Sequence, residues 1–331
     1  MKSIASHSKT ATVLQTLPIA GWGMTGAALA FTMMITAGSA HAAPTSYGYE
    51  NVEGIKIFYR EAGDPSKPSI VMLHGFPSSS HQYRDLITDL SDDYHVIAPD
   101  YPGFGSSDFP TPDTFTYTFD NLADVMDTFI EQRGIEEYSL VMHDYGAPVG
   151  FRIALEHPER VSALLVQNGN AYIEGVSQAA TEPLQALWEN RTDEADAMVA
   201  ANLFTVEALQ WQYTHGTRNP ESILPDNWLM DYERVQRPGQ YKVQLDLLTN
   251  YTSNIEAYPA WQAYLREHQP PVLVTWGKND PFFTPPGAEG YARDVKDIEI
   301  HMLDTGHFPL EEDGPFIAET TIEFLKARGI E

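Results

Sequence analysis

A carboxylate at a strand-to-helix junction is the first candidate for a reactive group in this chain. Asp144 lies in the segment VMHDYGA (141–147), between an apolar run and a helical pattern, where Gly146 and Ala147 permit a tight turn. In a nucleophile elbow such a turn projects the central side chain above the sheet. The usual serine is replaced here by an aspartate, whose carboxylate can attack carbon and form an ester that water later hydrolyses. Two observations count against this interpretation: aspartate is also common as a helix N-cap, and Met142 occupies a place where a small residue often relieves crowding.

A histidine near the C-terminus is the candidate base. His307 lies in TGHF (305–308), after the last strand-like run and before the last helix, where a loop can reach back over the sheet. A neutral imidazole can take a proton from water near pH 7, and hydrolysis of an ester intermediate needs such a base.

A second aspartate is the candidate partner of that base. Asp280 ends the segment WGKND (276–280), directly after a strand-like run. A buried carboxylate there could hold the tautomer of His307 and stabilise its charged form. The alternative is a turn aspartate before Pro281. Asp304 is a rival for the same role, but a carboxylate three residues from the histidine in one turn is less suited to reach its far nitrogen.

The segment HGFP (74–77) follows the first buried strand pattern. Its contribution would come from the backbone, because the N–H of Phe76 could join that of Tyr145 in an oxyanion hole. Each of these signals is weak alone. Their chain order (HGFP, Asp, Asp, His), each at a strand end, is much more specific.

Alternating strand and helix patterns are expected to position these residues. After a hairpin at 49–62, strands are predicted at 70–73, 94–98, 138–142, 161–166, 270–276 and 298–303, and helices at 81–90, 121–132, 147–155 and 315–327. Continuous apolar strands that alternate with helices indicate a mostly parallel, doubly wound α/β sheet covered on both faces.

This alternation is interrupted by about a hundred residues. The segment 171–268 is aromatic-rich and helical in character, without a convincing buried strand. We therefore predict a core formed by 43–170 and 269–331, with 171–268 inserted as a helical cap. Ligands of open α/β sheets bind outside the carboxyl ends of the strands, where such a cap would lie.

At this point the chain resembles the α/β-hydrolase superfamily, and within it the aspartate-nucleophile branch of epoxide hydrolases and haloalkane or haloacetate dehalogenases. The resemblance covers the chain from about Tyr49 to the end. Its motifs are HGFP (74–77), DYPGFGSSD (100–108), HDYG (143–146), Asp280 and Gly306-His307. It implies that Asp144 is the nucleophile, His307 the base that activates water and Asp280 its orienting acid, with no metal or organic cofactor.

The resemblance also suggests how the branches differ. Epoxide opening needs an acid for the departing alkoxide, and relatives use cap tyrosines; Tyr251 is the candidate for one and Tyr213 for the second. The alternative is that both are packed cap aromatics. Hydrolysis of an epoxide to a vicinal diol is therefore the leading hypothesis.

Hydrolytic dehalogenation is the runner-up. Dehalogenases commonly place a tryptophan after the nucleophile, where this chain has Tyr145, and haloalkane enzymes tend to have a polar residue in place of Phe76. The arginine that haloacetate enzymes carry after the nucleophile is missing too. Four cap tryptophans keep this hypothesis open: Trp188, Trp211, Trp228 and Trp261. Another C–X or ester substrate is a third catalytic hypothesis. The non-catalytic alternative is a binding or sensory protein that retains the fold, since fold alone does not establish activity.

Composition bounds the partners. The chain has 331 residues, with 46 acidic and 20 basic ones and a formal net charge of −26. Such a surface repels nucleic acid and anionic lipid. We expect a small hydrophobic substrate as the partner, and oligomeric state is left open.

The first residues have a different pattern. Lys2 and Lys9 precede an apolar stretch at 23–37, and residues 38–42 (GSAHA) end in the small-x-small pattern that signal peptidases accept. We predict that 1–42 is a cleaved export signal, so that the mature protein is periplasmic or secreted without stable membrane association. An uncleaved N-terminal anchor is the alternative. Cysteine is absent, so disulfides cannot indicate the compartment.

Overall fold

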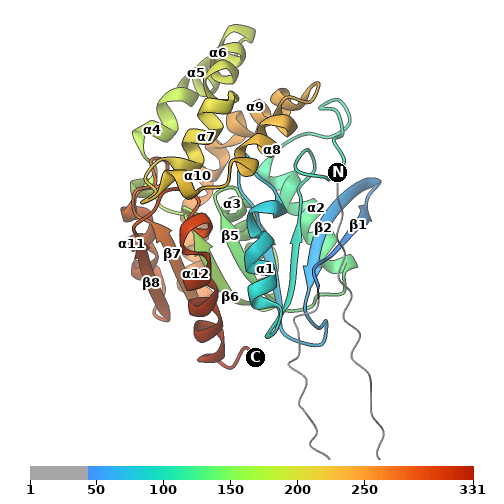
Figure 1. Ribbon diagram of the computed structural model, residues 1–331, viewed down its shortest axis with the longest axis vertical. Coiled ribbons are helices and arrows are strands. Elements are labelled where there is room, and N and C mark those ends of the chain that lie inside the picture. The colour runs from blue at the N-terminus through green and yellow to red at the C-terminus, as the bar shows by residue number, and fades with distance from the viewer. Residues whose placement is uncertain (1–43) are drawn as a thin grey trace, which may run out of the picture. The chain divides into compact units, whose positions relative to one another are not determined.

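An eight-stranded sheet lies at the centre of the computed structural model, which describes residues 44–331; the predicted export signal lies outside the described residues. The strand order is β1-β2-β4-β3-β5-β6-β7-β8. The pairs β1–β2 and β2–β4 are antiparallel and the other neighbours are parallel (Figure 1). The strands are β1 (Ser46–Val52), β2 (Ile55–Ala62), β3 (Ser69–Leu73), β4 (His95–Pro99), β5 (Tyr138–His143), β6 (Val161–Gln167), β7 (Val272–Gly277) and β8 (Ile298–Leu303).

Helices cover both faces of this sheet because its central strands are apolar on both sides. Side chains alternate between the faces of a strand, so Ile70 and Met72 of β3 pack on one face and Val71 and Leu73 on the other. The first face is covered by α1 (Arg84–Leu90) and α12 (Leu310–Lys326), and the second by α2 (Phe119–Gln132), α3 (Gly146–Glu156) and α11 (Pro285–Asp294). The doubly wound α/β architecture is confirmed.

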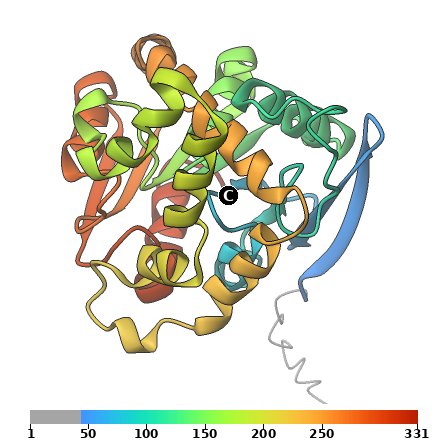
Figure 2. The same cartoon turned by 90° about the horizontal axis from the view of Figure 1, so that it is seen from above.

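The segment between β6 and β7 is helical. It contains α4 (Gln178–Thr181), α5 (Gln185–Asn190), α6 (Asp193–Leu203), α7 (Val206–Thr214), α8 (Pro225–Val235), α9 (Gln240–Asn250) and α10 (Thr252–His268). Hydroxyl N-caps start three of these helices: the side chains of Ser177, Thr192 and Thr205 accept hydrogen bonds from the first turns of α4, α6 and α7. Most of these helices lie over the carboxyl ends of the parallel strands (Figures 1 and 2).

Short 3₁₀ turns complete the connections: η1 (Ser80–Tyr83), η2 (Pro158–Arg160), η3 (Ile173–Gly175), η4 (Glu182–Leu184) and η5 (Pro220–Ser222). The helix predicted at 81–90 is divided into η1 and α1. Among the described residues, no helix combines the length and apolar character that a membrane span requires.

Two details of the core differ from the sequence prediction. Helix α11 was not predicted, because its sequence PPGAEGYARD begins with two prolines and contains two glycines. Proline is nevertheless well suited to the first turn of a helix, where its missing N–H has no partner to lose. The last helix begins at Leu310 rather than Pro315, with a non-helical kink at Asp313 just before that proline.

Candidate active site

Asp144 occupies a tight turn between β5 and α3. Its φ is 50°, a left-handed conformation that non-glycine residues seldom adopt and that occurs often at functional sites. Two glycines make the turn possible. A Cβ on Gly75 would lie 2.4 Å from the Asp144 Cβ, and one on Gly146 would lie 2.0 Å from the Leu73 carbonyl oxygen. The backbone therefore has the geometry of a nucleophile elbow, as the sequence predicts.

A glycine on α3 accommodates the large side chain of Met142. A Cβ on Gly150 would lie 2.4 Å from the Met142 Sδ. The crowding expected from a methionine before the elbow is therefore relieved one helical turn further along the chain.

The Asp144 carboxylate has two distinct oxygens. Oδ1 accepts a hydrogen bond of 2.6 Å from the Phe76 N–H, while Oδ2 lies 3.9 Å from His307 Nε2. Burial raises the pKa of the carboxyl to about 6, although His307 and the backbone amides of Phe76 and Tyr145 counteract this effect. The Phe76 amide holds the carboxylate by its Oδ1, and Oδ2 is the oxygen that faces His307.

His307 and Asp280 form a buried hydrogen-bonded pair. His307 Nδ1 lies 2.8 Å from Asp280 Oδ2. Burial by itself lowers the pKa of His307, but the charge and hydrogen bond of Asp280 outweigh it, so the pKa is raised. The rival carboxylate of Asp304 is half-exposed and pairs with Lys278 at 3.0 Å. The structure therefore brings Asp280, and not Asp304, to the imidazole.

Asn168 is a site residue that the sequence analysis missed. It follows β6, is fully buried, and donates from Nδ2 to Asp280 Oδ2 at 2.7 Å. Its Oδ1 accepts from the Gly277 N–H at 2.9 Å. The Phe282 N–H donates to the other Asp280 oxygen at 2.8 Å. A polar residue directly after a buried strand was the available signal, since β6 ends beside β7 at the edge where Asp280 lies.

Two further buried histidines support the loops of the site. His143 Nε2 lies 2.8 Å from the backbone oxygen of His307, and His74 Nε2 accepts from the Tyr101 N–H at 3.2 Å. Burial lowers the pKa of His143 well below its usual value and that of His74 to about 4. Both are therefore neutral at pH 7 and hold the loops without adding charge.

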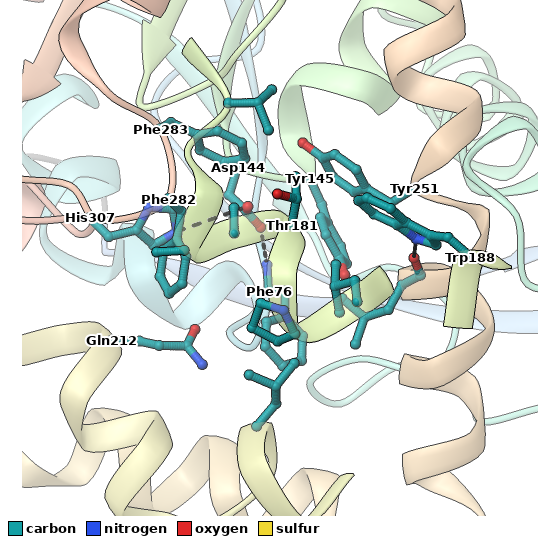
Figure 3. A pocket seen from close by; sticks show the side chains of 17 residues that line it. Phe76, Asp144, Tyr145, Thr181, Trp188, Gln212, Tyr251, Phe282, Phe283 and His307 are labelled. Carbon is teal, nitrogen blue, oxygen red and sulfur yellow. Dashed lines mark hydrogen bonds and ion pairs between the residues drawn. The ribbon is translucent and has the colours of Figure 1, made fainter. Parts of the chain in front are cut away.

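A mostly apolar cavity lies between this strand edge and the cap (Figure 3). It encloses about 670 Å³, including open solvent at its mouth. Asp144, His307, Phe76, Tyr145 and Tyr251 all line it, so five of the predicted site residues meet there. The remaining lining is Val176, Ala179, Ala180, Thr181, Pro183, Leu184, Trp188, Leu203, Gln212, Leu248, Phe282 and Phe283.

The two predicted cap tyrosines have different positions. Tyr251 is buried in the cavity wall, with its ring 6.2 Å from that of Tyr145. Tyr213 is not among the lining residues, and its hydroxyl donates to Asp231 at 2.6 Å. The preceding residue, Gln212, lines the cavity instead. Neighbouring residues of a helix point about 100° apart, so the two side chains cannot both face it. The proposed role of Tyr213 as a proton donor therefore does not fit its position.

The cap tryptophans offer few free N–H groups to the cavity. Trp188 is the one of the four that lines it, and its Nε1 donates to the Leu248 carbonyl at 2.9 Å. Trp211 lines a neighbouring cavity and is 42% exposed. Among the residues that the structure describes, no cap indole besides that of Trp188 lines the cavity that holds the carboxylate.

One cluster away from this cavity has metal-ligating residue types. Asp127, Glu131 and His157 bring one ligand atom each within 4.8 Å of one another. The guanidinium of Arg160 already approaches Glu131 at 3.4 Å and Asp127 at 3.9 Å. We therefore interpret the cluster as an ion-pair network.

Comparison with known proteins places this geometry in a family. The family described as alpha/beta hydrolase fold matches residues 68–314. An uncharacterized hydrolase of Saccharomyces cerevisiae is 40% identical over 277 residues, which cover 82% of this chain and 94% of the relative. A cis-3-alkyl-4-alkyloxetan-2-one decarboxylase of Xanthomonas campestris is 37% identical over 296 residues, covering 82% of this chain and 93% of the relative.

More distant relatives include a haloalkane dehalogenase and an epoxide hydrolase. A haloalkane dehalogenase of Mycolicibacterium paratuberculosis is 28% identical (82% of this chain, 88% of the relative). Epoxide hydrolase 2 of Caenorhabditis elegans is 24% identical (84% and 79%). The crystal structure of a haloalkane dehalogenase from Bradyrhizobium elkani has a TM-score of 0.71 at 24% identity, covering 86% of this chain and 99% of that one.

Proposed function

The chain belongs to the alpha/beta hydrolase fold family, and from that premise we propose that it hydrolyses apolar epoxides to vicinal diols through a covalent ester on Asp144. One observation carries the choice of substrate: a buried tyrosine, Tyr251, lines the apolar cavity that also holds the Asp144 carboxylate. A phenol can give a proton to an alkoxide leaving group, whereas a halide needs no proton.

In the first step, Oδ2 of Asp144 attacks one ring carbon. The C–O bond of the epoxide breaks, and its electron pair moves to oxygen as Tyr251 donates its proton. Burial raises the pKa of Tyr251 well above its usual value, and the nearby charge of Asp144 adds to this effect. The hydroxyl is therefore fully protonated when the substrate arrives. The products of this step are a hydroxyalkyl ester on Asp144 and a tyrosinate.

In the second step, His307 Nε2 removes a proton from water, and the resulting hydroxide equivalent adds to the Asp144 carbonyl carbon. The Phe76 N–H, which is already bonded to Oδ1, stabilises the oxyanion that develops there, and the Tyr145 N–H assists. Asp280 stabilises the imidazolium across their 2.8 Å hydrogen bond. Collapse of the tetrahedral intermediate expels the diol as its alkoxide, which takes the proton of the newly formed Asp144 carboxylic acid. The proton on His307 then restores the neutral tyrosine.

Hydrolytic dehalogenation is the second candidate, because the 28% identical relative is a haloalkane dehalogenase. The same Asp144 attack would expel a halide, which needs N–H donors around it. The indole N–H of Trp188 is committed to the Leu248 carbonyl, and this bond argues against that candidate.

Opening of a cyclic ester is the third candidate, supported by the 37% identical oxetan-2-one decarboxylase. An oxetan-2-one is a strained four-membered ring, so a carboxylate can open it as it can open an epoxide. Release of carbon dioxide would identify this activity.

Trapping the intermediate tests the proposal. The His307→Gln variant lacks the base of the second step, so an ester should form on Asp144 and persist. We would incubate it with epoxides, haloalkanes and a cis-dialkyl oxetan-2-one and locate the added mass by peptide mass spectrometry. The wild type would be assayed in parallel for diol, halide and carbon dioxide.

The products separate the candidates. An adduct of one whole epoxide on Asp144, with diol from the wild type, is the expected result. An alkyl adduct with halide release, or carbon dioxide from the oxetan-2-one alone, would replace the proposal by one of the other activities. An inert wild type without any adduct would favour the non-catalytic alternative.

A further inference from the structure

A second, larger cavity adjoins the catalytic one on the cap side. It encloses about 1020 Å³, including open solvent, and is lined by α6 and α7 residues together with Glu182 and Phe282. Five residues line both cavities: Ala179, Pro183, Leu203, Gln212 and Phe282. Gln212 is the one among these five with a polar side chain. It therefore lies where a molecule entering from the outer cavity would pass into the inner one.

The other polar cap side chains of the inner cavity already have partners. The Thr181 hydroxyl donates to backbone oxygens of its own helix, and the Trp188 N–H donates to the Leu248 carbonyl. The partner of the Tyr251 hydroxyl is the departing alkoxide of the proposed first step, and the nearby Tyr258 hydroxyl accepts from Asn170 Nδ2 at 3.2 Å.

Gln212 differs from these side chains. The residue is only 4% exposed. Its amide nevertheless forms no hydrogen bond to another residue of the described segment 44–331, and the amide atoms remain accessible from the cavity. Its side chain points into the cavity from α7, on the His307 side of Asp144 and away from Tyr251 (Figure 3). A nearly buried amide without a protein partner has donor and acceptor capacity that a ligand can satisfy.

We propose that Gln212 binds a carbonyl or hydroxyl group that the substrate carries beyond its reactive ring. This inference rests on the proposed function and specifies its substrate class: elongated epoxides with a second polar group, rather than plain alkyl epoxides. The reactive ring lies against Asp144 and Tyr251, the polar group lies at Gln212, and the rest of the molecule extends into the outer cavity. The lining there includes exposed Glu182 and Asn202, so the far end can be hydrophilic.

Matched substrates and matched variants test this assignment. The substrates are 1,2-epoxyoctane and the same chain with one carbonyl at successive carbons. Gln212→Leu removes the hydrogen-bonding group at similar size. Gln210→Leu is the control, because it makes the same change at an exposed position of the same helix. For the best keto-epoxide, the ratio of its kcat/KM to that of 1,2-epoxyoctane should fall about tenfold in Gln212→Leu, the effect of one lost hydrogen bond. The change should lie mainly in KM, and Gln210→Leu should leave the ratio as in wild type.

A binding measurement keeps the test independent of turnover. Calorimetry would compare 1,2-octanediol with the diol of the best keto-epoxide, or with each keto-diol in turn if no epoxide is hydrolysed. The wild type should prefer a keto-diol and Gln212→Leu should lose that preference, whether or not the epoxide proposal holds. An unchanged ratio in both measurements would overturn the role of Gln212. A fall in kcat for all epoxides with ester accumulating on Asp144 would also overturn it, since Gln212 would then position the hydrolytic water.

Discussion

The strand edge of the core and the cap use polar side chains in opposite ways. At the strand edge, polar groups from different strand ends bond to one another: Asp280 accepts from His307, Asn168 and the Phe282 N–H. In the cap, the polar groups of the cavity bond mostly within the cap itself, as the Trp188 N–H does with Leu248. The core thus holds a fixed constellation of polar groups, which in the proposed mechanism acts on any substrate, while the cap supplies a largely apolar wall with few free groups. Substitutions in the core should change the rate for all substrates, and substitutions in the cap should change the choice among them.

The largest effect is expected at the nucleophile. Asp144→Ala removes the attacking oxygen, so every substrate should lose activity, by about 10⁴-fold or more in kcat. Steady-state rates on the whole panel would measure this, with circular dichroism to verify folding. Residual activity above a few per cent would place the nucleophile elsewhere and would contradict the assignment of the chemistry to the core.

The next largest effect is expected at Asp280, with Asp304 as its control. Asp280→Asn should lower kcat by about 10²- to 10⁴-fold, because the amide can favour the wrong tautomer of His307. Asp304→Asn changes a half-exposed carboxylate bonded to Lys278 and should change kcat less than twofold. Equal losses in the two variants would contradict the assignment of the orienting acid.

The positions of the catalytic candidates show why much of the core site could be predicted from the sequence. A buried parallel strand is a continuous apolar run, so its carboxyl end can be located within a residue or two, and the residues that follow must meet at one edge of the sheet. Asp144, Asp280 and His307 are all placed by this rule. Asn168 follows the same rule and was missed because an amide was not sought as a partner of a carboxylate.

The cap could not be predicted at the same level. Choosing Tyr213 rather than Gln212 is an error of one residue, but on a helix it is a rotation of about 100°. Helix α7 gives no clear apolar face to correct the error, because it packs against other cap helices and also borders two cavities. Which residue faces the cavity therefore depends on tertiary packing.

In the cap, Tyr251 should have the largest effect, and it should depend on the substrate. Tyr251→Phe removes the proton donor for the alkoxide, so ester formation from epoxides should slow by about 10- to 100-fold. Ester formation from a haloalkane, if any occurs, should be unaffected by loss of the acid. Pre-steady-state adduct formation in the His307→Gln background measures the first step alone. Equal losses for both substrate types would mean that Tyr251 acts through packing rather than as an acid.

The pH dependence should separate the two steps within the core. In the proposed mechanism Asp144 attacks only when ionised, so ester formation should rise with pH up to a pKa of about 6, tenfold per unit below it. His307 accepts a proton only when neutral, and Asp280 raises its pKa above the usual 6.5. Ester hydrolysis should therefore continue to rise at pH values where ester formation has levelled off. Single-turnover formation and decay of the adduct, measured from pH 5 to 9, would give both limbs. If the rates of both steps rose over the same pH range, a single titrating group would control them.

The smallest effect on catalysis is expected at Asp231, a buried carboxyl of the cap that has no part in the proposed chemistry. Asp231 lies on α8, accepts the Tyr213 hydroxyl at 2.6 Å and is 4% exposed. Burial raises its pKa from 3.8 to about 7, against the opposing effects of Tyr213 and Arg234.

Because the folded state binds the proton more tightly than the unfolded one, this group destabilises the fold progressively as pH rises from about 4 to 7, and fully above that range. Asp231→Asn removes this titration, although its amide NH₂ brings a new donor that offsets part of the gain. Because that offset does not depend on pH, we expect the advantage of the variant over wild type in unfolding free energy to grow by about 2 to 3 kcal/mol between pH 5 and pH 8. Urea unfolding at both pH values would measure it. An identical pH dependence in the two proteins would mean that Asp231 stays ionised in the fold. Burial would then raise the pKa of the strand-edge carboxyl Asp144 but not that of the cap carboxyl Asp231.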